Sequence, residues 1–400
     1  MKFTKNDEKL MQLVKRRKVS YQRIKMYDIV FNELYQLFEK TLTQFIKESR
    51  AEQQPFLDNN GNPKILELDE RKINKYQFLY SNYLDTTGNS ERTKKTKLIT
   101  FRCLFNEYNI ELPKPLNFNV IHERTRTRDL PTWNDVKKSL KYCINPRDKA
   151  IVTLLATSGM REGDAVSFTI QDFLNATEIY HDGTLENLLL LNPYEIVPCY
   201  DFKPAKTSNR GNVCITYNTG ECTQHIFQYL KERIKNNISV KPKTPLFHSY
   251  LNKGFLKSNA IIKIFQRINE KLNTGMDKNG YYGKFRAHNL RKLFSTTCRR
   301  NITNIVVKND KYTELDFISI FTGHTPPNMN NSEVYDAIDD VDGSNNPLRQ
   351  TYEALIPYLI IDKNKQKTKT ENDSLETEIM KIKESVDILL TNKKQLILKS

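Results

Sequence analysis

The chain has no run of apolar residues long enough to cross a membrane, which takes about 18 to 20 such residues. Its start, from Met1 to Lys9, is mostly polar and charged, so we expect no signal-peptide core there. Six cysteines are present without a C-x-x-C pair. This scatter argues against a zinc site and against a disulfide framework. The cytoplasm is therefore the expected compartment.

Acidic side chains are also in deficit, with 47 Asp and Glu against 63 Lys and Arg, a formal net charge of +16. No cluster of carboxylates accompanies the histidines, which argues against a metal-dependent nuclease. A basic chain fits a polyanionic partner, but charge alone does not separate nucleic acid from anionic lipid or from simple solubility. No internal repeat is evident. A length of 400 residues predicts two domains and a tail.

The first part of the chain predicts a small all-helical domain over residues 1–112. Apolar residues recur at helical spacing from Tyr21 to Lys47, which predicts one amphipathic helix there. Further helices are predicted near 72–84 and over about 92–108, the latter basic on one side. The intervening segment 58–63 has the composition of a turn or loop.

Prolines at 113 and 115 end this pattern, and residues 113–129 read as a basic linker. A basic run is usually a solvated face, but several runs on one surface would form a footprint for phosphates. The candidate phosphate contacts are Arg16, Arg17, Lys94, Lys95 and Lys97 in the helical domain, and Arg124, Arg126 and Arg128 in the linker.

Residues 130–361 predict a second domain that is mainly α with a small antiparallel β-sheet. Thr132 is expected to cap a helix, and an apolar helix over 146–157 ends at Ser158-Gly159. The pattern from Leu188 to Tyr217 is strand-like, with a polar hairpin loop over 206–211. More helices are expected near 223–236, 258–272, 289–300 and 314–321.

The tail, 362–400, is first rich in lysine and then places apolar residues at alternating four- and three-residue steps from Leu375 to Leu389. This spacing makes two heptads, opened by a capping box from Asp373 to Glu376. Two interpretations stay open: a terminal helix packed on its own domain, or a helix for self-association or for a partner.

Several single residues in the second domain have both an ordinary and a chemical interpretation. Arg161 follows the apolar helix directly, and it either forms a plain ion pair with Asp164 or holds an anion. Lys206 lies in the hairpin loop, where lysines are usually solvent-exposed. His288 is either a helix cap or a functional group. His324 is either a turn residue or a functional group.

Taken in order, these residues give Arg, Lys, His-x-x-Arg, Gly-His and Tyr, a set able to break and rejoin a phosphodiester without a metal. Two guanidiniums hold the nonbridging oxygens and neutralise the charge that grows in the transition state. A tyrosine hydroxyl attacks phosphorus, displaces a 5′-hydroxyl and leaves a 3′-phosphotyrosyl link. A lysine brings a proton to the leaving oxygen, and a histidine gives acid–base help to the entering group.

On these residues the chain resembles the tyrosine recombinases of the phage-integrase family, over both domains. The matching positions are Arg161 after its Gly-hydrophobic pair, Asp164, the hairpin Lys206, the His288-Asn289-Leu290-Arg291 box, Gly323-His324 and the nucleophile Tyr335. Lys203 is a second choice for the lysine and Tyr352 for the nucleophile. Lys292 and Thr322 stand where the family commonly has His and Leu, and the interval from His324 to Tyr335 is longer than usual.

The resemblance implies a site-specific DNA recombinase or integrase that needs no cofactor, metal or ATP. Its partner would be double-stranded DNA at a specific site, on which a homo-oligomer, a tetramer, assembles away from any membrane. Abundant Lys, Asn and Ile indicate an AT-rich host, so we expect a virus or another mobile element, and a nucleoid-associated location in a prokaryote. Two alternatives stay open: a type IB topoisomerase, and a catalytically inactive DNA-binding relative.

Overall fold

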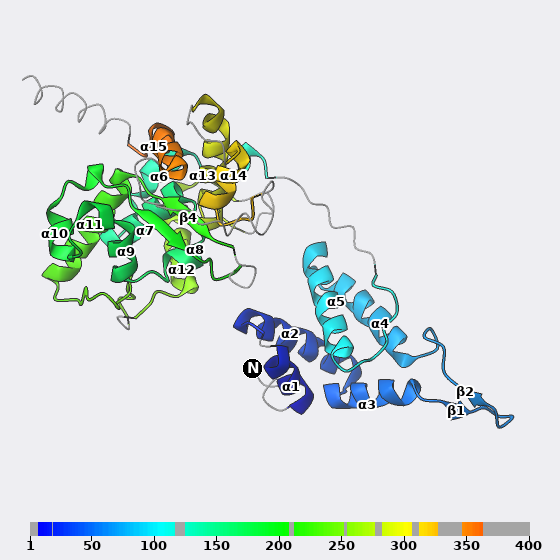
Figure 1. Cartoon of the computed structure of the whole chain (residues 1–400). Helices are drawn as coiled ribbons and strands as arrows, with labels where there is room; N and C mark the ends of the chain where they lie inside the picture. Colours follow the sequence, from blue (N-terminus) through cyan, green and yellow to red (C-terminus); the bar gives the residue numbers. More distant parts are fainter. Residues whose placement is uncertain are drawn as a thin grey trace, which may run out of the picture. The chain divides into compact units, whose positions relative to one another are not determined.

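The computed structural model describes residues 7–17, 19–116, 125–207, 212–251, 254–276, 282–305, 312–326 and 346–362. The chain divides into two compact units, Met1–Arg124 and Thr125–Ser400, and each is described by itself (Figure 1). Both are mainly α-helical, and the described residues form two small antiparallel sheets of two strands each. This architecture confirms the predicted fold class. None of the described helices combines the length and the apolar character of a membrane span.

The first unit contains five helices within the described residues. They are α1 (Glu8–Arg17), α2 (Tyr21–Phe38), α3 (Leu42–Glu52), α4 (Lys72–Thr86) and α5 (Glu91–Asn106). The prediction of one helix from 21 to 47 is wrong, because the chain turns at Glu39, which has a left-handed φ of 52°. Thr41 then starts α3 through a capping box with Gln44. Local capping thus ends a helix that apolar spacing alone would continue.

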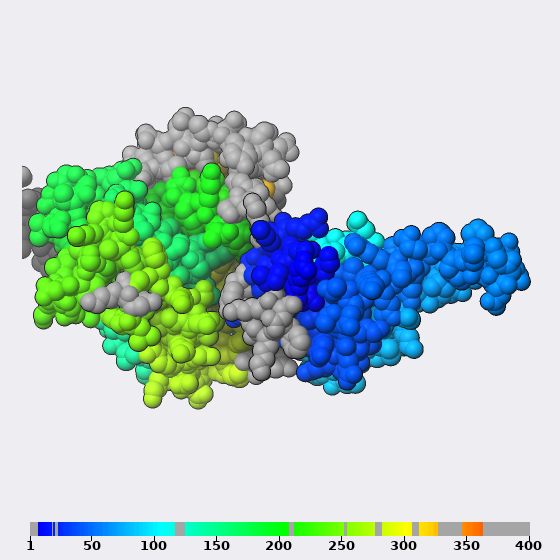
Figure 2. All heavy atoms as spheres, turned by 90° about the horizontal axis from the view of Figure 1, so that it is seen from below, coloured from blue at the N-terminus to red at the C-terminus, as the bar shows by residue number. Residues whose placement is uncertain are grey.

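The predicted loop at 58–63 is the turn of a short hairpin between β1 (Phe56–Leu57) and β2 (Pro63–Lys64). The carboxylate of Asp58 accepts hydrogen bonds from the backbone N–H groups of Asn60 and Asn62, at 2.9 and 2.8 Å. Gly61 has a φ of 79°, which a residue with a side chain rarely adopts. The hairpin projects away from the helices of its unit (Figures 1 and 2).

The core of the first unit brings together apolar side chains from all five helices, including Leu13, Phe31, Phe45, Tyr80 and Phe101. One ion pair lies at its edge. Lys97 of α5 contacts Glu33 of α2 at 2.5 Å, and the Tyr80 hydroxyl donates to the other oxygen of Glu33 at 2.7 Å. Both Lys97 and Glu33 are largely buried. Lys97 therefore neutralises a carboxylate inside its own unit.

The second unit holds ten described α-helices, α6 to α15. They are α6 (Trp133–Ser139), α7 (Pro146–Ser158), α8 (Glu162–Ala165), α9 (Ile170–Ala176), α10 (Leu185–Leu190), α11 (Gly220–Lys235), α12 (Ser258–Leu272), α13 (Ala287–Asn301), α14 (Glu314–Phe321) and α15 (Pro347–Leu359). Short 3-10 turns are η1 (Thr127–Asp129), η2 (Glu178–Tyr180), η3 (Pro193–Glu195) and η5 (Ile302–Asn304). The helices predicted from caps and apolar spacing are present, with small differences at their ends.

The strand-like prediction over 188–217 is only partly right. Its first part forms α10, which Thr184 caps, and its middle forms η3. The strands are β3 (Cys199–Phe202) and β4 (Cys214–Tyr217), and they pair antiparallel with Cys199 opposite Tyr217. A short apolar run does not by itself distinguish a buried helix from a strand, which explains the error.

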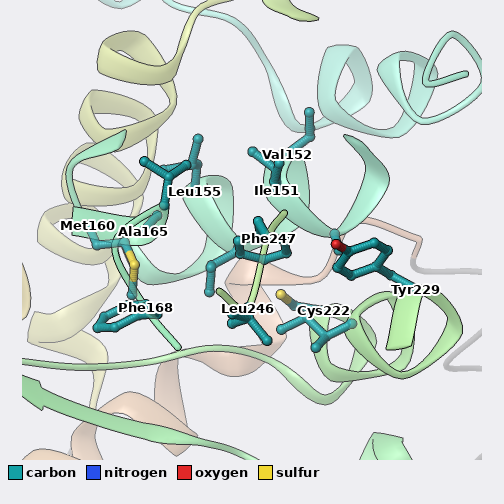
Figure 3. Packing of buried hydrophobic residues seen from close by; sticks show 14 of the residues in the cluster. Ile151, Val152, Leu155, Met160, Ala165, Phe168, Cys222, Tyr229, Leu246 and Phe247 are labelled. Atoms are coloured by element: carbon teal, nitrogen blue, oxygen red, sulfur yellow. The ribbon is translucent and has the colours of Figure 1, made fainter. Parts of the chain in front are cut away.

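Helix α7 lies at the centre of the second unit, and every residue from Ala150 to Ser158 is buried. Helices α11 and α13 pack against it. Figure 3 shows Ile151 and Leu155 of α7 packed around Leu246 and Phe247, with Cys222 of α11 beside them. In Figure 2, the visible face of this unit is formed mostly by the green-to-yellow stretch around α11 and α12. A helix buried on all sides gives its C-terminal end a fixed position.

The end of the predicted linker is attached to the second unit. Lys292 of α13 donates to the Thr125 hydroxyl at 2.7 Å, and Arg300 of the same helix donates to Thr127 at 2.9 Å. Lys284 donates to the carbonyl of Arg128 at 3.3 Å. The linker segment 117–124 and the predicted tail helix at 375–389 lie outside the described residues.

Replacing Lys97 by methionine is expected to destabilise the first unit by about 2 to 3 kcal/mol, because Glu33 would keep a buried charge with Tyr80 as its remaining partner. Lys95→Met on the exposed face of α5 is the matched control and should change stability little. The single tryptophan, Trp133, lies in the second unit. Lys97→Met should therefore move the far-UV circular dichroism transition in urea and leave the fluorescence transition in place. Equal effects of the two substitutions would contradict this account.

Candidate active site

Helix α7 ends at Gly159, where the site begins. Gly159 has a φ of 65°, and a Cβ atom there would lie 2.2 Å from the ring of Phe294. Only glycine fits this turn, for reasons of both conformation and space. The turn leaves the Gly159 carbonyl pointing toward α13, where it accepts a hydrogen bond from Nη1 of Arg291 at 2.7 Å.

Arg291 lies one turn into α13, and 8% of its surface is exposed. Its second nitrogen, Nη2, donates to the carbonyl of Thr322 and lies 3.4 Å from Nε2 of His324. Burial, and then the nearby charge of Arg161, lower the pKa of Arg291 to about 10. The group stays charged at neutral pH, and main-chain carbonyls from the ends of two helices hold it.

Arg161 is the N-cap residue of α8, and its Nη2 donates to the Gly323 carbonyl at 3.3 Å. Its Nη1 lies 4.0 Å from Oδ2 of Asp164. Among the residues that the structure describes, Asp164 is the one carboxylate within ion-pairing distance of either guanidinium. Two cations therefore share one distant counter-charge, an arrangement that attracts an anion.

Asp164 has a second contact that a plain ion pair would not need. Its Oδ1 accepts a hydrogen bond from the backbone N–H of Ala205 at 3.0 Å, and the residue is 4% exposed. Ala205 immediately precedes Lys206 in the β3–β4 connection. Asp164 thus links the turn that carries Arg161 to the start of the loop that carries Lys206.

The chain just after α14 packs closely against two other parts of the site. Gly323 has a φ of 57°, and a Cβ atom there would lie 2.9 Å from Cγ of Pro204, 3.0 Å from Cβ of Cys214 and 3.4 Å from Nη1 of Arg161. The glycine lets α14, the β3–β4 hairpin and Arg161 meet at one point. Beneath them, burial raises the pKa of Cys214 to about 12, so its thiol is neutral.

His324 follows this glycine directly. Its backbone N–H donates to the Ser319 carbonyl at 2.8 Å, which folds the chain back over the end of α14. The residue is exposed, and its pKa is nevertheless lowered to about 4, because part of the ring is buried and because Arg291 and Arg161 lie close. The imidazole is therefore neutral at physiological pH.

His288 lies in the first turn of α13 and is also exposed. Its pKa is lowered by partial burial first, and then by four nearby cations: Lys292, Arg286, Arg291 and Lys206. Because Lys206 is one of these four cations, its side chain lies close enough to act on His288 electrostatically. The alternative lysine, Lys203, is exposed in the same connection.

The structure describes one of the two candidate nucleophiles, Tyr352, while Tyr335 lies outside the described residues. Tyr352 of α15 is fully buried, and its hydroxyl donates to the Thr157 carbonyl at 2.7 Å. Its ring lies 5.1 Å from that of Tyr217, and burial raises its pKa well above the usual value. A hydroxyl held in this core is not accessible to a phosphate, so Tyr352 is a packing residue in this structure.

The predicted phosphate contacts of the first unit fall into two groups. Arg16 and Arg17 pair with Glu107, Lys94 pairs with Asp85 and Glu91, and Lys97 pairs with Glu33. Lys95 is exposed on α5. In the second unit, Arg126 precedes η1 and Arg128 lies within it, and both are exposed. Arg124 lies outside the described residues. A phosphate would compete with an internal carboxylate at the paired residues but not at Lys95.

The structure brings Arg161, Arg291, His324 and Asp164 together, with His288 and Lys206 within electrostatic reach of one another. The sequence reasoning overlooked the backbone acceptors of Gly159 and Thr322, and the Thr322 hydroxyl. The sequence predicts Gly159 only as a helix stop, although a glycine at a helix end two residues before an arginine leaves carbonyl groups without partners inside the helix. Within the described residues, no group of three or more His, Cys, Asp or Glu side chains is arranged to hold a metal ion.

No family model matches the chain, and no curated protein does. Several solved structures are similar to it. A crystal structure of XerA recombinase is 16% identical, covers 82% of this chain and 94% of its own, and has a TM-score of 0.31. XerH site-specific recombinase, in a post-cleavage complex with a palindromic difH substrate, is 16% identical over 91% of this chain and 82% of its own, with a TM-score of 0.47.

A third structure is the Tn1549 transposon integrase in complex with circular intermediate DNA. It is 12% identical and covers 75% of this chain and 91% of its own, with a TM-score of 0.39. At these TM-scores and identities, none of the three likenesses carries weight for function. The case for function therefore rests on the residues of the site.

Gly323→Ala is expected to destabilise the second unit by at least about 1 to 2 kcal/mol, because a side chain at this φ is strained and Pro204 and Cys214 leave it no room. Gly163→Ala in α8 is the matched control, since a Cβ atom there meets nothing within 4 Å. It should change stability by less than about 1 kcal/mol. Urea unfolding followed by Trp133 fluorescence measures both, and a neutral Gly323→Ala would refute the close approach.

Proposed function

We propose that the chain is a site-specific DNA recombinase of the tyrosine recombinase class, which cleaves and rejoins DNA strands through a covalent phosphotyrosine. The observation that supports this most strongly is the guanidinium pair of Arg161 and Arg291. Backbone carbonyls hold both groups, and one carboxylate lies 4.0 Å from one of them. A single phosphate placed between them would accept hydrogen bonds and receive compensating charge in the transition state.

In the cleavage step, the hydroxyl oxygen of Tyr335 attacks phosphorus, and the bond from phosphorus to the 5′-oxygen breaks. The pKa of His288 is lowered by burial and by its cationic neighbours, so the ring is neutral and able to accept the tyrosine proton. Lys206, on the exposed hairpin, gives a proton to the leaving 5′-oxygen. The 3′-phosphotyrosyl link conserves the bond for the reverse step, in which another 5′-hydroxyl attacks.

Binding to DNA is proposed to involve exposed basic side chains from both units, with Lys95, Arg126 and Arg128 as the described candidates. Arg124 belongs to the same proposal from the sequence alone. Because each phosphate contact releases counterions, affinity should fall steeply with salt. Strand exchange between two duplexes needs several protomers, so a tetramer assembled on DNA is part of the proposal, as is an origin in a virus or another mobile element.

Tyr335→Phe is expected to abolish covalent capture of DNA and to leave binding nearly unchanged, because it removes the attacking oxygen alone. Tyr352→Phe is the matched control, and it should retain capture while losing about 1 to 3 kcal/mol of stability with its buried hydrogen bond. A nicked suicide substrate, a denaturing gel and peptide mapping of the adduct measure the outcome. An adduct that persists in Tyr335→Phe would exclude Tyr335 as the nucleophile.

The same substrate also distinguishes the competing functions. Cleavage that depends on added metal and gives no protein–DNA adduct would favour a nuclease. Relaxation of supercoiled plasmids without any site preference would favour a type IB topoisomerase. Binding without capture by the wild-type chain would favour an inactive relative.

Arg161→Ala and Arg291→Ala are each expected to slow covalent capture by at least about 10²-fold, because each removes charge and hydrogen bonds at the phosphate. His324→Ala should cost far less, since a histidine ring can donate at most one hydrogen bond to the phosphate, whereas each guanidinium offers several donors and a permanent charge. Arg291→Lys keeps the positive charge but loses the paired N–H donors of the guanidinium. Trp133 fluorescence in urea checks that each variant folds. Equal losses at all three positions would contradict this division of roles.

A further inference from the structure

The hydroxyl of Thr322 makes a contact in the site that the proposed mechanism does not use. Thr322 is the C-cap residue of α14 and is 2% exposed. Its Oγ1 lies 2.7 Å from the Ile318 carbonyl, 3.3 Å from the Ser319 carbonyl and 2.9 Å from Nδ1 of His324. A hydroxyl has one proton to donate, so these contacts determine which atom is the donor.

The two carbonyls accept hydrogen bonds and cannot donate them, and the shorter of these contacts takes the hydroxyl proton. The oxygen of Thr322 is then left as an acceptor toward His324, and Nδ1 must carry the ring proton. On the other side of the ring, Nε2 faces Nη2 of Arg291 at 3.4 Å. A guanidinium only donates, so Nε2 must be the bare nitrogen, and both contacts give the same tautomer.

A ring in this state accepts a hydrogen bond at Nε2 but cannot donate one. The charged groups that face it in the described structure are Arg291 from α13 and Arg161 at the start of α8, and both oppose a second proton. Asp164 lies beside Arg161 and offsets part of its charge. An anion between the two arginines would reverse this balance, because an opposite charge within about 4–6 Å favours a protonated ring.

We propose that Thr322 is a positioning residue that holds the single proton of neutral His324 on Nδ1, and that an anion bound by Arg161 and Arg291 brings a second proton to Nε2. His324 thereby becomes a hydrogen-bond donor only when a phosphate is present. The tautomer rests on contacts within this chain alone. The proton uptake also rests on the proposed function, since it requires that the guanidinium pair bind phosphate.

The tautomer is tested on the ¹⁵N-labelled full chain by long-range ¹H–¹⁵N NMR, in which protonated and bare imidazole nitrogens have well-separated shifts. His324→Asn assigns the signals. The wild type at neutral pH should show a protonated Nδ1 and a bare Nε2. Thr322→Val, which has the same shape without the hydroxyl, should weaken this preference, because only the 3.4 Å contact to Arg291 then favours it. Thr322→Ser should keep it in full.

Three results would overturn the assignment: a protonated Nε2 in the wild type, an undiminished preference in Thr322→Val, or a lost preference in Thr322→Ser. Unfolding of Thr322→Val would not remove the test, because the wild type and Thr322→Ser still report the tautomer. None of these readouts depends on DNA cleavage, so failure of the recombinase proposal at Tyr335 would be seen separately.

Proton uptake is tested by titrating the His324 signals with pH in the absence and presence of inorganic phosphate. Phosphate should raise the pKa of His324 by about 1 to 3 units, as expected for an anion that comes within a few ångströms of the ring. Arg161→Lys should weaken this rise without changing the tautomer. A pKa that does not move over the whole phosphate titration would overturn the uptake, while the tautomer result would stand.

Discussion

The site depends on two guanidiniums held by main-chain carbonyls rather than by carboxylates. The acceptors of Arg291 are Gly159 and Thr322, the C-cap residues of α7 and α14. The carbonyl end of a helix carries partial negative charge, which stabilises a cation without cancelling its charge. Arg291 is therefore buried with its positive charge intact, and Arg161 is partly buried. A pair neutralised by carboxylates would be equally ordered, but it would have no charge left for a phosphate.

Partial burial and this charge together favour the neutral state of the two histidines. Both His288 and His324 have lowered pKa values, by partial burial first and then by cations, and both are neutral at physiological pH. Their surroundings differ in kind. His288 lies among cations from α13 and near Lys206, and these cations favour its neutral ring. The ring of His324 is held between Thr322 and Arg291, which leaves it little freedom to reorient.

The basic side chains of the first unit show why a charge run is a weak signal for binding. Lys94 and Lys97 lie in the same basic stretch as Lys95, yet both are buried beside carboxylates of their own unit. Lys95, on the other face of α5, is exposed. Helical geometry thus gives three near-neighbours in sequence different surroundings: Lys97 forms a largely buried ion pair, Lys94 pairs with two exposed carboxylates, and Lys95 lies at the surface.

Caps, glycines and apolar spacing determined most helices of the chain from the sequence alone, because these signals act within one turn of the helix that they start or end. They also indicated the residue types of the site. The sequence did not reveal the break at Glu39, the helix in place of a strand at α10, or the burial of Tyr352. Nor did it show that the ends of α7 and α14 meet around Arg291. These contacts join Arg291 to residues 132 and 31 positions away, and only tertiary packing brings them together.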